Sequence, residues 1–361
     1  MSGVHDAERL KELQALPLGR KVQITQTRII EWYQHFKGQV CVSFSGGKDS
    51  TVLLHIARQL YPDMRAVFSN TGLEYPEIQQ FVKTFDNVDI VYPEMRFDQV
   101  ISTYGYPLIG KEVAEAIYYA RRLGSRKVKT TCLKREELLG KRPNDENPDE
   151  RSRYNKEKWL PIAQELPVMA SHYCCDKMKK GPIHQYHTKM KVAPIIGTLA
   201  EESQRRRQAW IRHGCNSFEG NKRSSQPLSF WTGQDVLQYL KDYGIEIASV
   251  YGEIVGQPGN LRCSKCDRTG CIYCAFGAHS EKGETRFQRL AKTHPRQYEY
   301  CIGGGQWVDN PVYDPTAPKY DGEWQNWNPK QIWVPSKKGL GLGGVFQMVN
   351  EHYGKDFYRW E

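Results

Sequence analysis

The stretch SFSGGKDSTVLLHIA, residues Ser43–Ala57, decides the fold of this chain. It follows the β-prone run Gln39–Phe44 and continues into a helical pattern over Thr51–Tyr61, which predicts a strand, a glycine turn and a helix. Glycines let the backbone turn sharply so that several amide N–H groups point one way, and the following helix adds its positive end. A plain turn would explain one glycine but not the whole set. We therefore predict a phosphate-binding loop that comprises Ser45, Gly46, Gly47, Lys48, Asp49 and Ser50.

The flanking sequence predicts an α/β fold, with a parallel β-sheet flanked by helices. Further strands are expected at Arg65–Ser69, Val88–Val91 and Lys191–Gly197, and helices at Arg20–Phe36, Tyr75–Phe85 and Gly233–Tyr243. From Cys263 onward, cysteine, glycine and aromatic residues dominate, which predicts a cysteine-rich irregular C-terminal region rather than a second periodic core.

These patterns divide the chain into three parts. We expect an N-terminal helical segment over residues 1–37 and a nucleotide-binding α/β domain over 38–250. A basic insertion near 124–165 interrupts this domain, because apolar residues become few there. Residues 251–361 would form a metal-binding and aromatic region.

Composition restricts the class of protein. The 361 residues include 51 basic and 41 acidic ones, and the net charge of +10 favours polyanionic partners as much as a simply solvated basic surface. No apolar run is long enough for a membrane span, and the charged N-terminus is unlike a signal peptide, so we expect a cytoplasmic protein without a membrane partner. Cysteines are kept reduced in that compartment, so clusters among the ten indicate metal or redox chemistry.

Six cysteines lie in two tight groups. Cys174 and Cys175 are adjacent, and the second group has the spacing Cys263-x2-Cys266-x4-Cys271-x2-Cys274. Pairs separated by two residues hold Zn²⁺ or Fe–S clusters. The second group could complete a tetrahedral zinc site alone, or thiols from both groups could share one centre.

Four ordered motifs resemble one known family. The loop SGGKDS resembles the pyrophosphate-binding loop of the adenine-nucleotide α-hydrolase superfamily, whose members cleave ATP between the α and β phosphates. Within it, NTGLEYPE (Asn70–Glu77), GTLAEESQRR (Gly197–Arg206) and PLSFWTGQDV (Pro227–Val236) are similar to motifs of the phosphoadenosine phosphosulfate (PAPS) reductase family.

The resemblance implies a nucleotide, ATP or PAPS, lying over the strand ends with its phosphates on Ser43–Ser50. It places Thr71, Gly72 and Glu74 near the site, Gly197 against the nucleotide, and Arg206 toward phosphate or the acceptor. Lys48, Asp49 and Arg206 would be the catalytic residues, with Asp49 either touching Mg²⁺ or capping the helix. Glu202 could pair with an arginine or take part in catalysis.

The same resemblance favours a [4Fe–4S] cluster over Zn²⁺, because a Cys-Cys pair followed by Cys-x2-Cys is similar to the arrangement in assimilatory sulfate reductases. Cys174 or Cys175 would be joined by three of the later cysteines, with Cys271 and Cys274 preferred.

Three functions fit these residues. A reductase of PAPS or adenylyl sulfate would need a mobile cysteine in a C-terminal Cys-Gly motif, which Cys301 matches poorly, and its paired arginines are replaced by Thr198 and Leu199. We prefer an ATP pyrophosphatase that adenylates an acceptor for sulfur transfer, similar to the DNA-phosphorothioation branch that acts with a cysteine desulfurase. Its acceptor would be nucleic acid, near the basic run Arg121–Arg142. A nucleotide-binding Fe–S sensor subunit of a defence complex is the third function.

Overall fold

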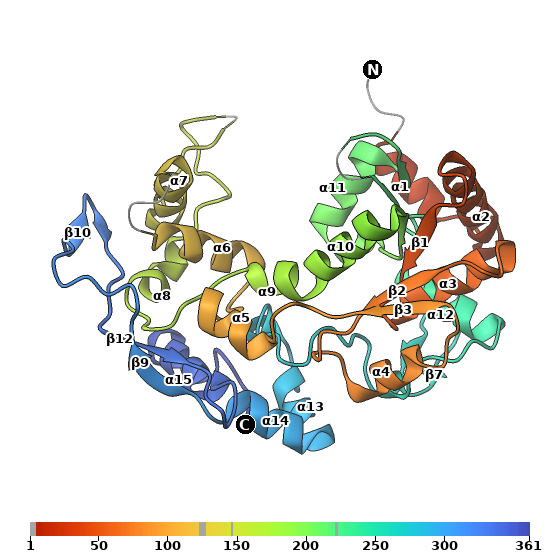
Figure 1. The fold of residues 1–361 in the computed structure, drawn as a ribbon. Coiled ribbons are helices and arrows are strands. Elements are labelled where there is room, and N and C mark those ends of the chain that lie inside the picture. Colours follow the sequence, from red (N-terminus) through yellow and green to blue (C-terminus); the bar gives the residue numbers. More distant parts are fainter. Residues whose placement is uncertain (1–4, 123–127, 146, 221–222) are drawn as a thin grey trace. The chain divides into compact units, whose positions relative to one another are not determined.

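The chain forms two compact units in a computed structural model that describes residues 5–122, 128–145, 147–220 and 223–361 (Figure 1). Unit 1 comprises Met1–Glu94 and Lys179–Cys271, and unit 2 comprises Met95–Met178 and Ile272–Glu361. Each unit therefore contains two separate stretches of chain. The boundary between the units does not coincide with the boundary at residue 250 that the sequence suggested between the α/β domain (38–250) and the C-terminal region (251–361). Among the described residues, no helix is both long and apolar enough to span a bilayer.

Unit 1 contains a six-stranded sheet with the order β3-β2-β1-β4-β6-β5. Its strands are β1 (Val40–Ser43), β2 (Ala66–Ser69), β3 (Val88–Val91), β4 (Ala193–Ile196), β5 (Asn216–Ser217) and β6 (Ser224–Ser225). All neighbours are parallel except β5 and β6. The predicted α/β class is confirmed. Because β1 lies between β2 and β4, the segments that follow these three strands meet at one edge of the sheet, where α/β proteins bind ligands.

Helices flank this sheet, as Figure 1 shows, with α2, α3 and α12 on one side and α10 on the other. The unit 1 helices are α1 (Ala7–Gln14), α2 (Leu18–His35), α3 (Lys48–Leu60), α4 (Pro76–Val82), α10 (Gly181–Met190), η3 (Ala200–Glu202), α11 (Gln204–His213), α12 (Gly233–Asp242) and η4 (Ser249–Tyr251). A small antiparallel pair, β7 (Ile254–Val255) and β8 (Arg262–Cys263), leads toward the cysteines.

Buried polar contacts attach α2 to the PLSFWTGQDV motif. Lys21 Nζ lies 2.6 Å from Asp235 Oδ2, and the indole N–H of Trp231 donates to Thr25 Oγ1 at 2.9 Å. Trp231 is fully buried and Asp235 takes part in the capping box of α12. These two motif residues therefore support the fold rather than contact a ligand.

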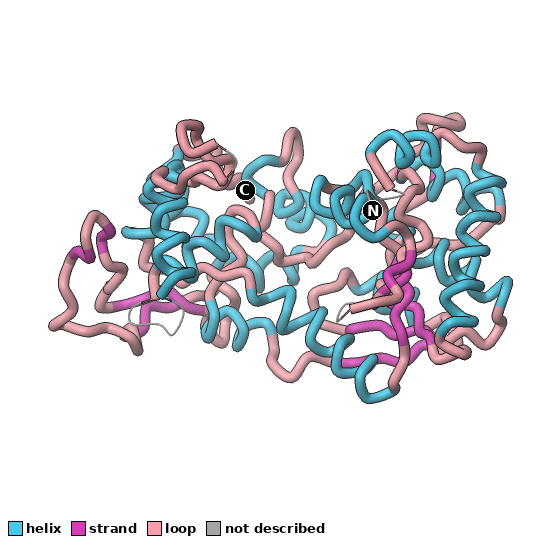
Figure 2. The backbone as a smooth tube through the Cα atoms, turned by 90° about the horizontal axis from the view of Figure 1, so that it is seen from above, coloured by secondary structure: helices cyan, strands magenta, loops and turns pink. Residues whose placement is uncertain are grey.

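Unit 2 is mainly helical, and Figure 2 shows how few of its residues lie in strands. Its helices are α5 (Phe97–Tyr104), α6 (Lys111–Ala120), α7 (Val128–Leu139), η1 (Glu157–Trp159), α8 (Leu160–Gln164), α9 (Tyr173–Cys175), η5 (Ala278–Ser280), α13 (Arg286–Thr293), α14 (Pro295–Ile302) and α15 (Leu342–Tyr353). The π-helical segment η2 (Asp176–Lys180) follows α9. Two antiparallel pairs are formed by β9 (Gln306–Asp309) with β12 (Gln331–Val334) and by β10 (Tyr320–Asp321) with β11 (Trp324–Gln325).

The C-terminal region is more regular than its composition predicts. Irregular backbone predominates between β8 and α13, but three helices follow. Thr285 caps α13, and Phe287 packs on Phe346 of α15 with ring centroids 5.0 Å apart. A second apolar core therefore forms from short segments whose periodicity is too brief to detect in the sequence.

Three arginines in the described part of the basic run Arg121–Arg142, which leaves out residues 123–127, make contacts within unit 2. Arg121 is buried and donates to the backbone oxygens of Ile162, Ala163, Leu166 and Val168. Arg135 pairs with Asp321, and Arg142 pairs with the fully buried carboxylate of Glu137. Arg121 serves backbone carbonyl groups, and Arg135 and Arg142 pair with carboxylates, so a nucleic-acid contact would have to use other cations.

Replacing Arg121 should destabilise unit 2. Arg121→Met removes the donors of four buried carbonyl groups, and we expect the free energy of unfolding to fall by about 3 kcal/mol. Urea titration followed by circular dichroism measures this change. Arg296→Met, which alters an exposed arginine of α14, is the matched control. Equal stability of the two variants would contradict the role of Arg121.

Candidate functional site

The predicted phosphate loop is a turn held together by its own serines. It connects β1 to α3, and Gly47 is the N-cap of the helix. Ser45 Oγ lies 3.0 Å from Ser50 Oγ and accepts from the amide of Gly47 at 3.3 Å, while the Ser50 hydroxyl donates to Gly47 O at 2.9 Å. The first-turn amides of a helix have no partner within the helix, so Lys48, Asp49 and Ser50 present N–H groups at the positive end of α3.

Two glycines let neighbouring backbone approach this turn closely. Gly46 has φ +69°, and a Cβ there would lie 2.8 Å from Val82 Cγ2 and 2.9 Å from Ile78 Cγ2. Gly197, directly after β4, would place a Cβ 3.1 Å from Asp49 O. Only glycine fits these two positions without displacing α4 or the first turn of α3.

Lys48 connects the loop to the second cysteine group. Its ammonium group lies 3.5 Å from Cys263 Sγ, donates to Asp267 O at 2.9 Å and lies 5.2 Å from the ring centroid of Tyr251. Burial raises the pKa of the Cys263 thiol, and the charge of Lys48 opposes this. A cation next to the phosphate loop is therefore also next to a sulfur atom.

Asp49 lies in the first turn of α3. Burial raises the pKa of its carboxyl group, while the nearby cations, Lys48 foremost, oppose the shift. The N-cap of α3 is Gly47, with no side-chain cap. Asp49 therefore does not cap the helix, and a contact with Mg²⁺ stays a prediction.

The NTGLEYPE segment forms a second polar group at the same edge of the sheet. Glu74 is buried and accepts from the Thr71 amide at 3.0 Å and the Thr71 hydroxyl at 2.8 Å. Gly72 has φ +72°, and the space around it would admit a Cβ, so it serves the turn. Lys179 Nζ lies 3.3 Å from Glu74 Oε1. Burial alone would lower the pKa of Lys179, but the Cys271 thiol and the Glu74 carboxylate raise it.

Arg206 is paired within the protein. Glu202 forms ion pairs with both Arg206 and Arg268. Of the two roles expected for Glu202, the structure therefore shows the pairing with arginine. Sequence reasoning assigned no role to Arg268 or Tyr251. The only sequence signal that could have identified Arg268 and Tyr251 is that both lie close in the chain to the cysteine group Cys263–Cys274.

The six predicted metal ligands are divided between the units. Cys263, Cys266 and Cys271 belong to unit 1, whereas Cys174, Cys175 and Cys274 belong to unit 2. None forms a disulfide, and the Sγ atoms of Cys174 and Cys175 lie 3.9 Å apart. In the part of the chain that the structure describes, no group of three or more Cys, His, Asp or Glu side chains could hold a metal ion. Reduced thiols are nevertheless the right donors for an Fe–S cluster or Zn²⁺.

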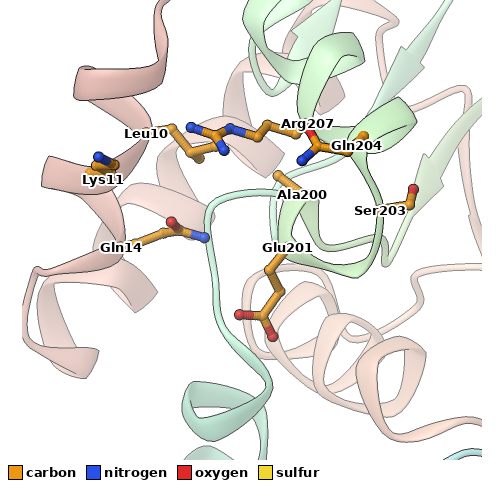
Figure 3. Close-up of a pocket in the computed structure, with 8 residues that line it drawn as sticks. All are labelled: Leu10, Lys11, Gln14, Ala200, Glu201, Ser203, Gln204 and Arg207. Atoms are coloured by element: carbon orange, nitrogen blue, oxygen red, sulfur yellow. The ribbon is translucent and has the colours of Figure 1, made fainter. Parts of the chain in front are cut away.

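A polar pocket of about 280 Å³ opens beside η3 in unit 1 (Figure 3). Its lining comes from α1, η3 and the start of α11, and comprises Leu10, Lys11, Gln14, Ala200, Glu201, Ser203, Gln204 and Arg207. Glu201 Oε1 also accepts from the amide of Gly233 at 2.5 Å. No residue predicted for the site lines this pocket.

A glycine-rich turn at the carboxyl end of a central parallel strand defines an α/β domain of the phosphate-binding class. The chain belongs to the phosphoadenosine phosphosulfate reductase domain family, whose model matches residues 39–105 and 126–276.

Individual relatives are distant. An uncharacterized protein of Methanocaldococcus jannaschii is 23% identical over 288 residues, which cover 78% of this chain and 50% of that protein. Adenosine 5'-phosphosulfate reductase of Bacillus mycoides is 23% identical over 245 residues, covering 66% of this chain and 77% of the enzyme. The same-named enzyme of Bacillus cereus is 30% identical over 87 residues, covering 22% and 37%. The chain thus spans half of the Methanocaldococcus jannaschii protein and 37% of the Bacillus cereus enzyme, although it spans 77% of the Bacillus mycoides enzyme.

Two solved structures show weak similarity. One is PAPS reductase from Candida auris in a phosphate complex, with 12% identity, a TM-score of 0.35, and coverage of 72% of this chain and 100% of that one. The other is a U34-tRNA thiolase from Methanococcus maripaludis with its [4Fe–4S] cluster, with 13% identity, a TM-score of 0.33, and coverage of 78% and 76%.

The close packing at Gly46 predicts a sensitive position. Gly46→Ala adds a methyl group at a positive φ against two β-branched side chains, so we expect ATP affinity to fall at least tenfold and unfolding stability by about 2 kcal/mol. Isothermal titration calorimetry and urea unfolding measure the two effects. Gly19→Ala in α2, where a Cβ would meet nothing within 4 Å, is the control. Unchanged nucleotide affinity of Gly46→Ala would contradict the assignment of the loop.

Proposed function

We propose that the chain is an ATP pyrophosphatase that adenylates an acceptor and so prepares it for sulfur transfer, with nucleic acid as the acceptor. The observation that carries this proposal is the position of Lys48, which begins α3 in the phosphate loop and whose ammonium group lies 3.5 Å from Cys263 Sγ. A lysine that belongs to the phosphate loop and also reaches a cysteine sulfur suits a reaction in which a phosphate bond is broken and sulfur is transferred. Sulfur modification of DNA, as in phosphorothioation, is the specific form we propose.

The residues that follow β4 favour ATP over a sulfated nucleotide. Thr198 and Leu199 stand where the reductases have paired arginines, and Leu199 is buried. Glu202 pairs with both Arg206 and Arg268 and so cancels one of their two positive charges. The preference for ATP therefore rests on the missing arginine pair and on the loop amides and Lys48, which suit pyrophosphate.

The proposed chemistry begins with attack of an acceptor oxygen on the α-phosphorus of ATP. The bond from that phosphorus to the bridging oxygen breaks, and pyrophosphate leaves with the electron pair. Lys48 and the first-turn amides of α3 neutralise the charge that develops on it, and Asp49 would hold Mg²⁺. A sulfide-level sulfur then attacks the adenylated atom of the acceptor, and AMP leaves with the electron pair of the bond to oxygen. A cysteine desulfurase is the proposed source of this sulfur, and a thiol reductant releases it from the desulfurase persulfide.

A [4Fe–4S] cluster bound by thiols of the two cysteine groups would supply a site for handling that sulfur. Lys48 beside Cys263 and Lys179 beside Cys271 would stabilise the negative charge of bound thiolates. Zn²⁺ is the alternative occupant of the same residues.

Reduction of adenylyl sulfate or PAPS is the second candidate, because curated relatives are named adenosine 5'-phosphosulfate reductase. That reaction needs an accessible thiolate. Cys301 is completely buried in α14 and burial raises its thiol pKa well above the usual range, so Cys301 is unsuited to that role.

Pyrophosphate release distinguishes the candidates. We expect the protein to release pyrophosphate from ATP when a nucleic acid and a sulfur donor are present, and Lys48→Met to slow release at least a hundredfold. Lys83→Met, at an exposed lysine after α4, should leave the rate unchanged. Sulfite production from PAPS without pyrophosphate release from ATP would overturn the proposal in favour of the reductase. Tight ATP binding without turnover would favour a sensor.

Metal analysis tests the cluster. Protein purified without oxygen should contain iron and acid-labile sulfide, and Cys271→Ser and Cys274→Ser should each lose iron. Cys132→Ser, at an exposed cysteine outside both groups, should keep it. An active protein that contains zinc and no iron would contradict the cluster.

A further inference from the structure

Four tyrosines and a histidine of unit 2 lie in mutual contact, and we call them the tyrosine cluster. They are Tyr104, Tyr118, Tyr119, His172 and Tyr173, and they come from helices α5, α6 and the start of α9, which Figure 1 labels. The ring centroid of Tyr173 lies 5.1 Å from that of Tyr104 and 5.1 Å from that of Tyr118, and the hydroxyl oxygens of Tyr119 and Tyr173 are 3.2 Å apart. Three helices therefore contribute rings to one continuous surface.

The cluster differs from the tyrosines that build the core. All four of its tyrosines are only partly buried. Tyr106, two residues after Tyr104, is fully buried, and its hydroxyl donates to Leu340 O at 2.6 Å. Rings that only fill a core are normally fully buried. A group of partly exposed rings is instead typical of a surface that binds the flat, apolar face of a ligand.

Exposed cations stand on both sides of the cluster. The guanidinium carbon of Arg122 lies 5.5 Å from the ring centroid of Tyr118, and Lys177 Nζ lies 5.2 Å from that of Tyr104. Both side chains are exposed. In contrast to Arg121, Arg135 and Arg142, they keep their charge at the surface, where it can meet an anion.

We infer that the tyrosine cluster binds an unpaired nucleobase of a single-stranded nucleic acid, with Arg122 and Lys177 on the adjoining phosphates. Aromatic rings interleaved with cations are the chemistry by which proteins hold single strands, because every base has a face to stack and every linkage carries a charge. Tyr173 is followed directly by Cys174 and Cys175, so a strand held here lies beside two thiols. The inference rests on the proposed function, in which nucleic acid is the acceptor, and it names the surface that receives this acceptor.

Binding of short fluorescein-labelled oligonucleotides tests the inference through fluorescence anisotropy. The probes are single-stranded DNA, single-stranded RNA and duplex DNA of one mixed sequence. We expect the full-length protein to prefer single strands, and Tyr118→Leu to weaken their binding about tenfold. Tyr118→Phe, which keeps the ring, should bind as the unaltered protein does. Tyr92→Leu, at an exposed tyrosine of unit 1, is the matched control.

A second variant keeps the test informative if Tyr118→Leu does not fold. Arg122→Gln alters an exposed side chain, and we expect it to weaken binding and to reduce the slope of affinity against salt concentration. The relative affinities for the DNA and RNA strands show which polymer is preferred.

Three results would overturn the inference: absence of single-strand binding by the unaltered protein, equal loss in Tyr92→Leu and Tyr118→Leu, or full binding by both Tyr118→Leu and Arg122→Gln. Pyrophosphate release from ATP distinguishes this failure from that of the proposed function. Release that depends on nucleic acid but is unchanged in Tyr118→Leu and Arg122→Gln would refute the tyrosine cluster alone, whereas strand binding through the cluster without any release would refute the proposed reaction alone.

Discussion

The close approach of backbone to the first turn of α3 is the constraint on which the rest of the site depends. Gly197 at the end of β4 and Gly46 in the loop each sit where an added Cβ would collide with neighbouring atoms. This packing keeps the amide groups of the first turn directed toward the sheet edge, where a phosphate group can reach them. Because β2 and β4 flank β1, the same edge receives the Thr71–Glu74 turn.

Charge in this chain is mostly used locally. Although the net charge is +10, Arg121, Arg135 and Arg142 satisfy carbonyl and carboxylate groups within unit 2, and Arg206 pairs with Glu202. A long-range basic surface is therefore a poorer description than a few cations with defined tasks. Lys48 and Lys179 have such tasks, since each lies beside a thiol and beside a residue of the phosphate edge.

Much of unit 1 could be predicted because its signals are local. A β-prone run, a glycine turn and a helical pattern lie within about twenty residues, and the strands β1 to β4 fall inside the expected ranges. Unit 2 was harder to predict. Helix α7 lies in the segment expected to be an insertion, and α13 to α15 lie within the C-terminal region expected to be irregular, because short helices stabilised by tertiary packing leave weak periodicity.

The sequence by itself determined the α/β class, the loop Ser43–Ser50 and the thiol chemistry of the two cysteine groups, since each depends on residue types at short spacing. Only the tertiary structure decided that Lys48 lies against Cys263, that Glu202 pairs with two arginines, that Trp231 is a core residue, and that tyrosines from three helices lie in contact. These contacts join residues far apart in the chain, and their formation depends on how the strands and helices pack, which no local pattern records.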